Sequence, residues 1–313
     1  MSKVVKTKIE VYDPRMGDLI DSGAVLIQID SSSQHTEGPV YMPANDSVIW
    51  SDVSGNRLLR WRNDSVSVLR TPSCYQNGNA LDLEGRLVSC SHGDRAIIRQ
   101  DHDHQWRTLV NCYQDKQLNS PNDLVVKSDG TIWFTDPPFG LTQPNEGLGG
   151  EQEQPGSFVF RFDPATGDIE AVIIEMERPN GLVFSPDERL LYVSDTSAYE
   201  DAELYHDIRV YDVVEGRTVT NGRVFTVVDP GQPDGLCVDW QGHIFTSSKD
   251  SVQVYTPAGS ILGKILVPEI CANLTFGGVN RDRLLITAGT SLYAIDLNTQ
   301  GIQPVSKEIQ DGC

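Results

Sequence analysis

The sequence predicts an all-β fold, a six-bladed β-propeller with four-stranded antiparallel blades. Three observations favour it: a hairpin pattern that recurs six times, further strand pairs between the recurrences, and almost no helical periodicity. Repeats of short strands with turn residues throughout are typical of propellers, in which each blade buries its faces against its neighbours. We expect a single propeller domain over residues 1–313, with a β-sandwich as the alternative fold.

The recurring unit reads as an antiparallel hairpin. A polar or small residue opens a short apolar run, a polar turn follows, and a second apolar run ends in a small or acidic residue. The six copies are EGPVYMPANDSVIWSD from Glu37, NGNALDLEGRLVSCS from Asn77, PNDLVVKSDGTIWFTD from Pro121, PNGLVFSPDERLLYVSD from Pro179, PDGLCVDWQGHIFTSS from Pro233 and LTFGGVNRDRLLITA from Leu274.

The segments between the hairpins contain further strand pairs with their own turns, over residues 158–174, 208–225 and 252–266. Each repeat therefore holds about four strands. The N-terminal segment, residues 1–30, precedes the first repeat and includes one more apolar run, GAVLIQID over 23–30. We expect this run to supply the outer strand of the last blade and so close the ring.

Two blades carry insertions. Equivalent positions of successive repeats, at residues 37, 77, 122, 180, 234 and 274, are separated by 40, 45, 58, 54 and 40 positions, so the third and fourth blades are the longest. The extra residues fall at 141–157 and 196–207, in polar segments. Long polar loops at one end of a propeller often cover its mouth. We expect these two loops to shape substrate specificity.

One position of the repeat has unusual chemistry. It lies near the start of the first strand of each hairpin, and this strand lines the central channel of a propeller. Five of its six occupants carry side-chain oxygens. The occupants are Glu37, Asn77, Asn122, Asn180, Asp234 and Leu274.

Turn chemistry explains only part of this pattern. Asn-Gly and Asp-Gly are ordinary turn formers, which accounts for Asn180 and Asp234, but it does not account for Glu37. Carboxylates and amide carbonyls that converge on one point repel or stay unsatisfied unless a hard cation lies among them. The pattern favours calcium over magnesium, because magnesium prefers fewer protein ligands and more water.

The second strands of the hairpins end in a further set of small or acidic residues. Such residues commonly cap turns and bond neighbouring blades, and the sequence leaves open whether any of them takes part in a site. They are Asp52, Ser91, Asp136, Asp195, Ser248 and Ala288.

The composition excludes several classes of function. Lys and Arg number 25 against 44 Asp and Glu, a formal charge of −19, which repels nucleic acid and anionic membranes. The first thirty residues hold no apolar run long enough for a signal peptide or a spanning helix, and the six cysteines form no CxxC pair. We expect a cytoplasmic protein that binds small molecules. The motifs of zincins, α/β-hydrolases and nucleotide-binding proteins are missing from the sequence.

Four segments together resemble a known family. They are EGPVY at Glu37, LNSPNDLVVKSDGTIWFTDPPFGL from Leu118, RPNGLVFSPDERLLYVSD from Arg178 and QPDGLCVDWQGHIF from Gln232. The resemblance is to the gluconolactonase family that includes regucalcin (senescence marker protein) and luciferin-regenerating enzyme. It covers nearly the whole chain from Glu37 on, and the third blade looks closest to bacterial gluconolactonase-like members.

The resemblance implies a six-bladed propeller with one divalent cation on its axis, usually Ca²⁺, with Zn²⁺, Mn²⁺ or Mg²⁺ as other possibilities. The implied metal ligands fall on Glu37, Asn122, Asn180 and Asp234. One position departs from the family: animal members carry an arginine that grips the sugar lactone two residues before the motif's asparagine, where this chain has Ser120.

These features together predict a metal-dependent hydrolase that opens a sugar lactone, with Asp234 as the carboxylate that activates water. Asn122, Asn77, His92 and Phe139 are the expected substrate contacts. Two alternatives remain. Diisopropylfluorophosphatase uses a similar set of calcium ligands, so the site also suits an organophosphate or other ester hydrolase. A calcium-binding propeller without turnover is the other alternative.

Overall fold

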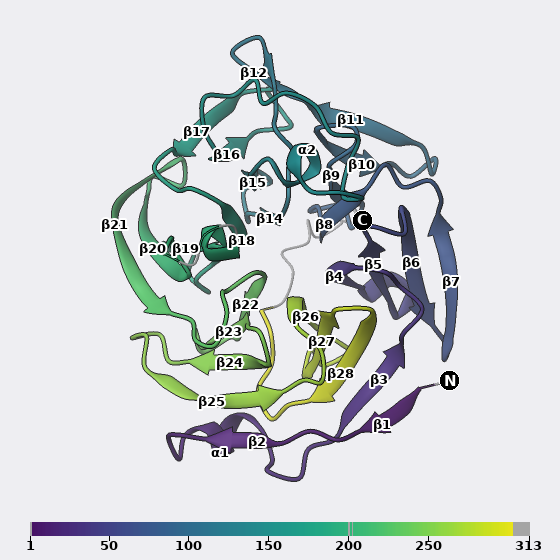
Figure 1. Cartoon of the computed structure of the whole chain (residues 1–313), viewed down its shortest axis with the longest axis vertical. Helices are drawn as coiled ribbons and strands as arrows, with labels where there is room; N and C mark the ends of the chain where they lie inside the picture. The colour runs from purple at the N-terminus through teal and green to yellow at the C-terminus, as the bar shows by residue number, and fades with distance from the viewer. Residues whose placement is uncertain (1, 200, 202, 303–313) are drawn as a thin grey trace, which may run out of the picture.

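The computed structural model describes residues 2–199, 201 and 203–302. In this part of the chain 26 of the 28 strands form six main sheets, which stand side by side around a central axis (Figure 1). Helical structure is confined to α1 (Met16–Leu19), α2 (Phe139–Thr142) and the 3₁₀ turns η1 (Pro43–Asn45) and η2 (Ser197–Tyr199). The predicted six-bladed propeller is confirmed.

Each blade consists of four antiparallel strands ordered from the axis outward. The innermost strands of blades one to six are β4 (Thr36–Met42), β8 (Gln76–Leu81), β14 (Leu124–Val126), β18 (Pro179–Phe184), β22 (Leu236–Val238) and β26 (Cys271–Gly277). The second strands are β5 (Ser47–Asp52), β9 (Leu87–Ser91), β15 (Ile132–Asp136), β19 (Leu190–Asp195), β23 (Ile244–Ser247) and β27 (Arg283–Ala288).

The third strands are β6 (Arg57–Arg62), β10 (Ala96–Gln100), β16 (Phe158–Phe162), β20 (Asp207–Val214), β24 (Ser251–Tyr255) and β28 (Ser291–Asp296). The outer strands are β7 (Ser65–Arg70), β11 (Trp106–Val110), β17 (Ile169–Ile173), β21 (Thr218–Val227), β25 (Ile261–Leu266) and β3 (Leu26–Asp30). A small hairpin, β12 (Cys112–Tyr113) with β13 (Lys116–Gln117), joins blades two and three.

The N-terminal segment completes the last two blades. Strand β3 pairs antiparallel with β28, with Gln28 opposite Tyr293, and so forms the fourth strand of blade six. Strand β1 (Lys3–Val5) adds a fifth strand to this blade, and β2 (Ile9–Val11) adds a fifth strand to blade five. Between β2 and β3 in the sequence, α1 buries Met16 and Leu19 against the apolar interior of blades five and six.

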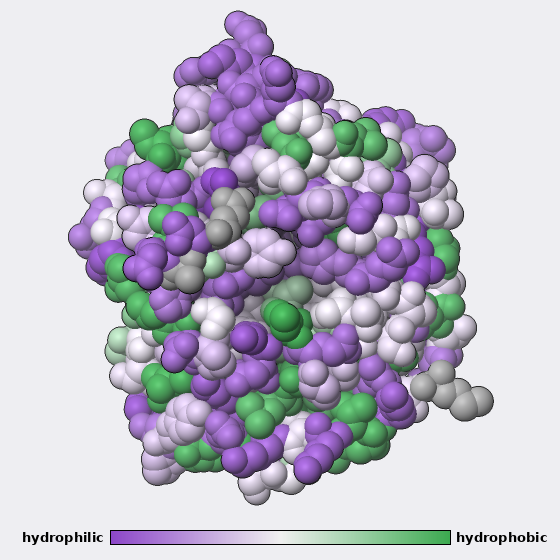
Figure 2. Space-filling model, in the orientation of Figure 1, coloured by the Kyte–Doolittle hydropathy of each residue, from purple (hydrophilic) through white to green (hydrophobic). Residues whose placement is uncertain are grey.

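Apolar side chains fill the spaces between neighbouring blades. Trp50 and Trp133 are fully buried, and the rings of Phe245 and Phe276 meet edge to face at 5.3 Å between blades five and six. The face turned toward the viewer is predominantly hydrophilic with scattered apolar residues, as expected for the strongly negative composition (Figure 2). No helix in residues 2–199, 201 and 203–302 is long and apolar enough to cross a membrane.

The acidic residues at the ends of the second strands cap turns. Asp52 Oδ1 accepts hydrogen bonds from the backbone amides of Gln34 and His35, at 2.8 and 3.1 Å. Asp136 Oδ2 accepts a hydrogen bond from Asn119 N at 2.7 Å, and Asp195 Oδ2 accepts one from Glu177 N at 3.1 Å. Each carboxylate therefore holds the segment that leads into the inner strand of its own blade. For Asp52, Asp136 and Asp195 the structure thus shows a structural role.

Candidate functional site

Five oxygen-bearing side chains lie where the inner strands begin. Glu37 is in β4, Asn77 in β8 and Asn180 in β18, while Asn122 and Asp234 stand two residues before β14 and β22. Four of them are buried and Asp234 is half-buried. Because the inner strands surround the axis, these residues form a ring at one end of the channel. We call them the axial ring.

A directed series of hydrogen bonds joins the amides of the axial ring. Asn77 Nδ2 donates to Asn122 Oδ1 at 2.9 Å, and Asn122 Nδ2 donates to Asn180 Oδ1 at 2.5 Å. Asn180 Nδ2 continues to Thr196 Oγ1 at 3.3 Å. Each amide oxygen in this series has a second lone pair. The series therefore fixes the orientation of three amides and leaves acceptor capacity on their oxygens.

His92 borders the axial ring and has a defined tautomer. Its Nδ1 lies 2.8 Å from the carbonyl oxygen of Glu146, which only accepts, so Nδ1 carries the proton. Burial lowers the pKa of His92, which favours the neutral ring. Nε2 is then an acceptor, and Asn77 Nδ2 lies 3.3 Å away with a hydrogen to donate. The two amide hydrogens of Asn77 are thus shared between His92 and Asn122.

The carboxyl groups around the axis are crowded. Burial raises the pKa of Glu37, and burial with the charges of Glu37 and Asp123 raises the pKa of Asp234 well above its usual range. Burial and the charge of Glu37 raise the pKa of Asp123 to about 7. Two oxygens are buried without any hydrogen-bond partner, Asp234 Oδ1 and Asn77 Oδ1. The site therefore concentrates negative charge and unsatisfied oxygen lone pairs.

The sixth blade does not contribute Leu274 to the axial ring, so this prediction was wrong. In blade four, Pro179 pairs with the strand end Asp195, and in blade six Cys271 pairs with Ala288. The residue equivalent to Asn180 is therefore Ala272, and Leu274 belongs to the apolar core of blades five and six. Ala272 lies 16 positions before Ala288, whereas the sequence alignment took a separation of 14 and so selected Leu274.

Behind the axial ring, a second contact crosses the axis. Asn273 Nδ2 donates a 3.1 Å hydrogen bond to Asp123 Oδ2. Asp123 Oδ1 accepts from Leu124 N, and Asn273 Oδ1 accepts from Leu274 N. The equivalent positions of the other blades include Gly38 and Gly78, which leave room for this contact. Asp123 and Asn273 thus close the channel just below the axial ring.

The insertion of blade three reaches over the site. Residues 139–149, which we call the strap, include α2 (Figure 1). The Glu146 carboxylate lies 3.4 Å from His35 Nδ1, and its charge outweighs burial to raise the pKa of His35. Gly140 N donates to Ser120 Oγ at 2.9 Å, and Ser120 Oγ donates to Pro137 O at 2.6 Å. Ser120 therefore anchors the strap.

Comparison with known proteins gives the family. The model of the SMP-30/Gluconolactonase/LRE-like region matches residues 35–290, most of the chain. The chain belongs to this family. It is 31% identical to a gluconolactonase of Zymomonas mobilis over 94% of this chain and 87% of the relative.

Two solved structures have the same fold as this chain. A gluconolactonase of Xanthomonas campestris, described as important in glucose secondary metabolic pathways, superposes with a TM-score of 0.89 at 37% identity and covers 95% of this chain and 97% of its own. Regucalcin of Agrobacterium tumefaciens, described as a calcium-binding protein, shares the fold with a TM-score of 0.73 at 18% identity. The match covers 90% of this chain and 96% of the regucalcin chain.

The donor set of the axial ring fits a hard divalent cation better than a soft one. In the described part of the chain no group of three His, Cys, Asp or Glu side chains is arranged to hold a metal ion. The axial ring instead offers two carboxylates and three amide oxygens, the donors that Ca²⁺ accepts. The unpartnered Asp234 Oδ1 and Asn77 Oδ1 are among them. The residues present thus fit the cation that the family resemblance implies.

Sequence reasoning missed four residues around the axial ring: His35, Asp123, Glu146 and Asn273. Asp123 lies within the repeat segment that begins at Pro121, and His35 lies two residues before Glu37, so both were available as candidates. Asn273 was hidden by the register error in blade six. Glu146 lies in an insertion whose fold no repeat predicts. Of the predicted substrate contacts, Asn77 and His92 adjoin Asn122, while Phe139 is buried at the start of α2, with 8% of its surface exposed.

Proposed function

We propose that this protein hydrolyses a sugar lactone at the axial ring with the help of a divalent cation. The favoured cation is Ca²⁺, and its proposed ligands are Glu37, Asn122, Asn180 and Asp234. The observation that carries the proposal is the convergence of five oxygen-bearing side chains, two of them with unpartnered buried oxygens, at one end of the channel. The family and its gluconolactonase relatives support the choice of a lactone as substrate.

A cation bound there would act as a Lewis acid on the lactone carbonyl oxygen. Asp234 is the proposed general base, because its Oδ1 is aimed at no partner in the protein and is free to take a proton from the attacking water. A carboxylate bound to a cation is a weak base, because the cation lowers its pKa, but it is held within reach of both the cation and the attacking water.

The remaining residues bind and orient. Asn122 and Asn77 present amide groups toward the same point, and their hydrogen bonds hold them in one orientation. His92 accepts from Asn77 on one side and is held by Glu146 O on the other, so it positions Asn77 and lies within reach of a substrate hydroxyl. Phe139, the first residue of the strap, is buried and is the proposed apolar contact of the substrate.

The test is hydrolysis of D-glucono-δ-lactone and a small panel of other lactones, followed by a pH indicator. The same protein is assayed as isolated, after EDTA, and after Ca²⁺, Zn²⁺, Mn²⁺ or Mg²⁺ is restored. We expect turnover that disappears with EDTA and returns with a divalent ion. A parallel assay with a phosphotriester separates lactone from organophosphate hydrolysis.

Two results would contradict the proposal. Turnover of the phosphotriester without turnover of any lactone would assign the axial ring to organophosphate chemistry. Binding of Ca²⁺ without hydrolysis of either substrate would make the protein a non-catalytic calcium-binding propeller. Lactone turnover that EDTA leaves unchanged would keep the substrate and remove the metal from the proposal.

A further inference from the structure

Beyond the contact between Asn273 and Asp123, the channel opens into a cavity of about 530 Å³. No residue of the axial ring lines it. The cavity is therefore separate from the proposed lactone site and lies in the half of the channel away from the strap. Its volume is within the range of small-molecule binding sites.

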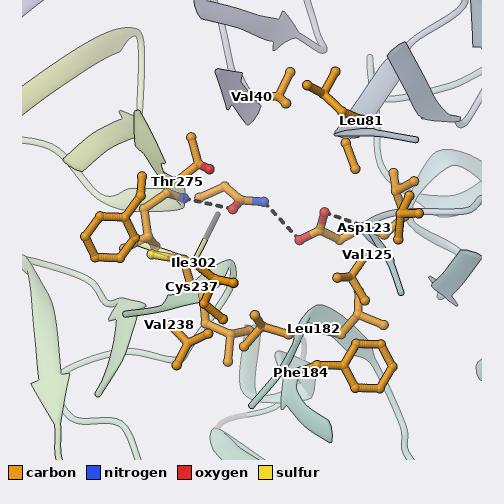
Figure 3. A pocket seen from close by; sticks show the side chains of 18 of the residues that line it. Val40, Leu81, Asp123, Val125, Leu182, Phe184, Cys237, Val238, Thr275 and Ile302 are labelled. Atoms are coloured by element: carbon orange, nitrogen blue, oxygen red, sulfur yellow. Dashed lines mark hydrogen bonds between the residues drawn. The ribbon is translucent and has the colours of Figure 1, made fainter. Parts of the chain in front are cut away.

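The wall of the cavity is largely apolar. All six inner strands contribute to it, and their side chains point toward one another across the channel (Figure 3). Residues that represent this wall are Val40, Leu81, Val125, Leu182, Phe184 and Val238. The strongly polar groups are confined to the two ends: Asp123 and Asn273 meet at the inner end, and Asp187, Glu188 and Arg281 line the opposite end. A ligand that fills the cavity must therefore present an apolar body.

Arg281 stands at the opposite end of the cavity, in the turn between β26 and β27. Its Nε atom is buried and has no hydrogen-bond partner. Within residues 2–199, 201 and 203–302, no carboxylate lies at ion-pair distance from Arg281, and burial lowers its pKa. A desolvated guanidinium without a counter-ion is costly, so this position favours an anion.

The acidic groups near this end are engaged elsewhere. Glu188 forms an ion pair with Lys127 at 2.8 Å, and Asp187 accepts a hydrogen bond from Ser185 Oγ at 2.7 Å. Neither carboxylate therefore neutralises Arg281. Among the described residues, the acids of this rim lie on blade four, and the Arg281 guanidinium, which has no carboxylate partner there, lies on blade six.

We propose that the cavity is a second binding site, for a monocarboxylate with an unbranched apolar body, such as a medium-chain fatty acid. The carboxylate pairs with the Arg281 guanidinium, whose planar fork suits a carboxylate. The apolar chain lies along the wall formed by the inner strands. This orientation keeps the ligand's charge away from Asp123, which occupies the other end.

Calorimetric titration of the full chain with decanoate tests the proposal, and decanol is the matched uncharged probe. EDTA is present throughout, so that no carboxylate binds through a metal at the axial ring. We expect one decanoate site, at least tenfold weaker binding of decanol, and at least tenfold loss of decanoate affinity in Arg281→Gln. Arg281→Lys should keep part of the affinity.

Two further variants locate the site. Leu81→Ser removes part of the apolar wall and should weaken decanoate and decanol alike. Arg15→Gln, at an arginine whose side chain is 58% exposed and pairs with Asp13 away from the cavity, is the matched control and should bind as the original chain does. Thermal unfolding of each variant shows that it is folded. No decanoate binding by the original chain, equal binding of decanol, or unchanged binding in Arg281→Gln would overturn the proposal.

Discussion

Asn273 of blade six donates a hydrogen bond to Asp123 of blade three, a residue 150 positions earlier in the chain and on the opposite side of the axis. Both side chains are buried. The bond joins two blades that share no sheet, and it separates the axial ring from the apolar cavity. A propeller is usually stabilised by contacts between neighbouring blades. This direct hydrogen bond across the axis is an additional constraint on the arrangement of the six blades.

The first prediction concerns this link. Asn273→Ala leaves Asp123 Oδ2 buried without its donor, and we expect a loss of about 1–3 kcal/mol in the free energy of unfolding. Urea denaturation measures it. Asn298→Ala, at an exposed asparagine, is the matched control and should change stability by less than about 0.5 kcal/mol. A double-mutant cycle with Asp123→Asn that gave no coupling energy would show that the contact is not a stabilising one.

The second prediction separates metal binding from catalysis. Asp234→Asn keeps a carbonyl oxygen at this position but removes the base, so kcat for the lactone should fall by about 10²–10⁴-fold while the cation is retained. Glu37→Gln should chiefly weaken binding of the cation, because it removes a charged ligand. Metal content and steady-state kinetics are measured on both variants. Loss of the cation together with activity in Asp234→Asn would leave Asp234 as a ligand only.

The third prediction addresses the strap. A Cβ at Gly147 would overlap the carbonyl oxygen of Gly140, so Gly147→Ala must displace the strap and the Glu146 carbonyl that holds His92. We expect kcat/KM for the lactone to fall by up to about 10²-fold. Gly23→Ala is the control, because a Cβ there meets no atom within 4 Å. Full activity of Gly147→Ala would mean that the strap does not position His92.

The fourth prediction is a pH dependence of stability. Burial raises the pKa of Asp136 from 3.8 to about 7 in the folded protein. Between these two values the folded state binds more protons than the unfolded state, so the contribution of Asp136 is greatest at low pH and is lost as the pH rises toward 7. At about 1.4 kcal/mol for each pKa unit, the change is of order 4 kcal/mol.

Asp136→Asn removes this titration and preserves an acceptor for Asn119 N. Urea denaturation should therefore give similar stability for the two proteins at pH 4 and a more stable variant at pH 8. Other buried carboxyl groups titrate in both proteins, so the difference between them isolates Asp136. A difference that stays constant from pH 4 to pH 8 would show that Asp136 titrates normally in the folded state.

The fifth prediction concerns closure of the ring. Leu26 in β3 is fully buried in the core of blades five and six, and Leu26→Ala should lower the free energy of unfolding by about 2–5 kcal/mol. Val25, immediately before this strand, is 47% exposed, and Val25→Ala should have little effect. Equal effects of the two substitutions, measured by urea denaturation, would indicate that β3 contributes little to stability.

The propeller was predictable because its information is local and repeated. Each hairpin carries its own turn residues and alternating apolar positions, so six weak signals support one another. The same repetition led to Glu37, Asn77, Asn122, Asn180 and Asp234, since equivalent positions must meet at the axis. Their roles in binding and catalysis remain predictions that the experiments above address.

The parts that sequence reasoning missed depend on contacts that no repeat specifies. In blade six the axial position lies 16 residues before the strand end, against 14 or 15 in the other blades, so the alignment selected Leu274 instead of Ala272 and concealed Asn273. The strap has no counterpart in other blades, so the approach of Glu146 to His35 and His92 follows only from tertiary structure. The absence of a carboxylate beside Arg281 in the described part of the chain likewise depends on which neighbours lie near it in space.

The pairing of Gln28 with Tyr293 has a consequence for synthesis of the chain. During translation β3 emerges among the first segments, but its partner β28 is made only after five blades have been completed. The nascent propeller must therefore remain an open arc, with the apolar side of β3 uncovered, until the last blade leaves the ribosome. Contacts so distant in sequence form slowly. A chaperone that shields β3 during this interval would raise the yield of folded protein.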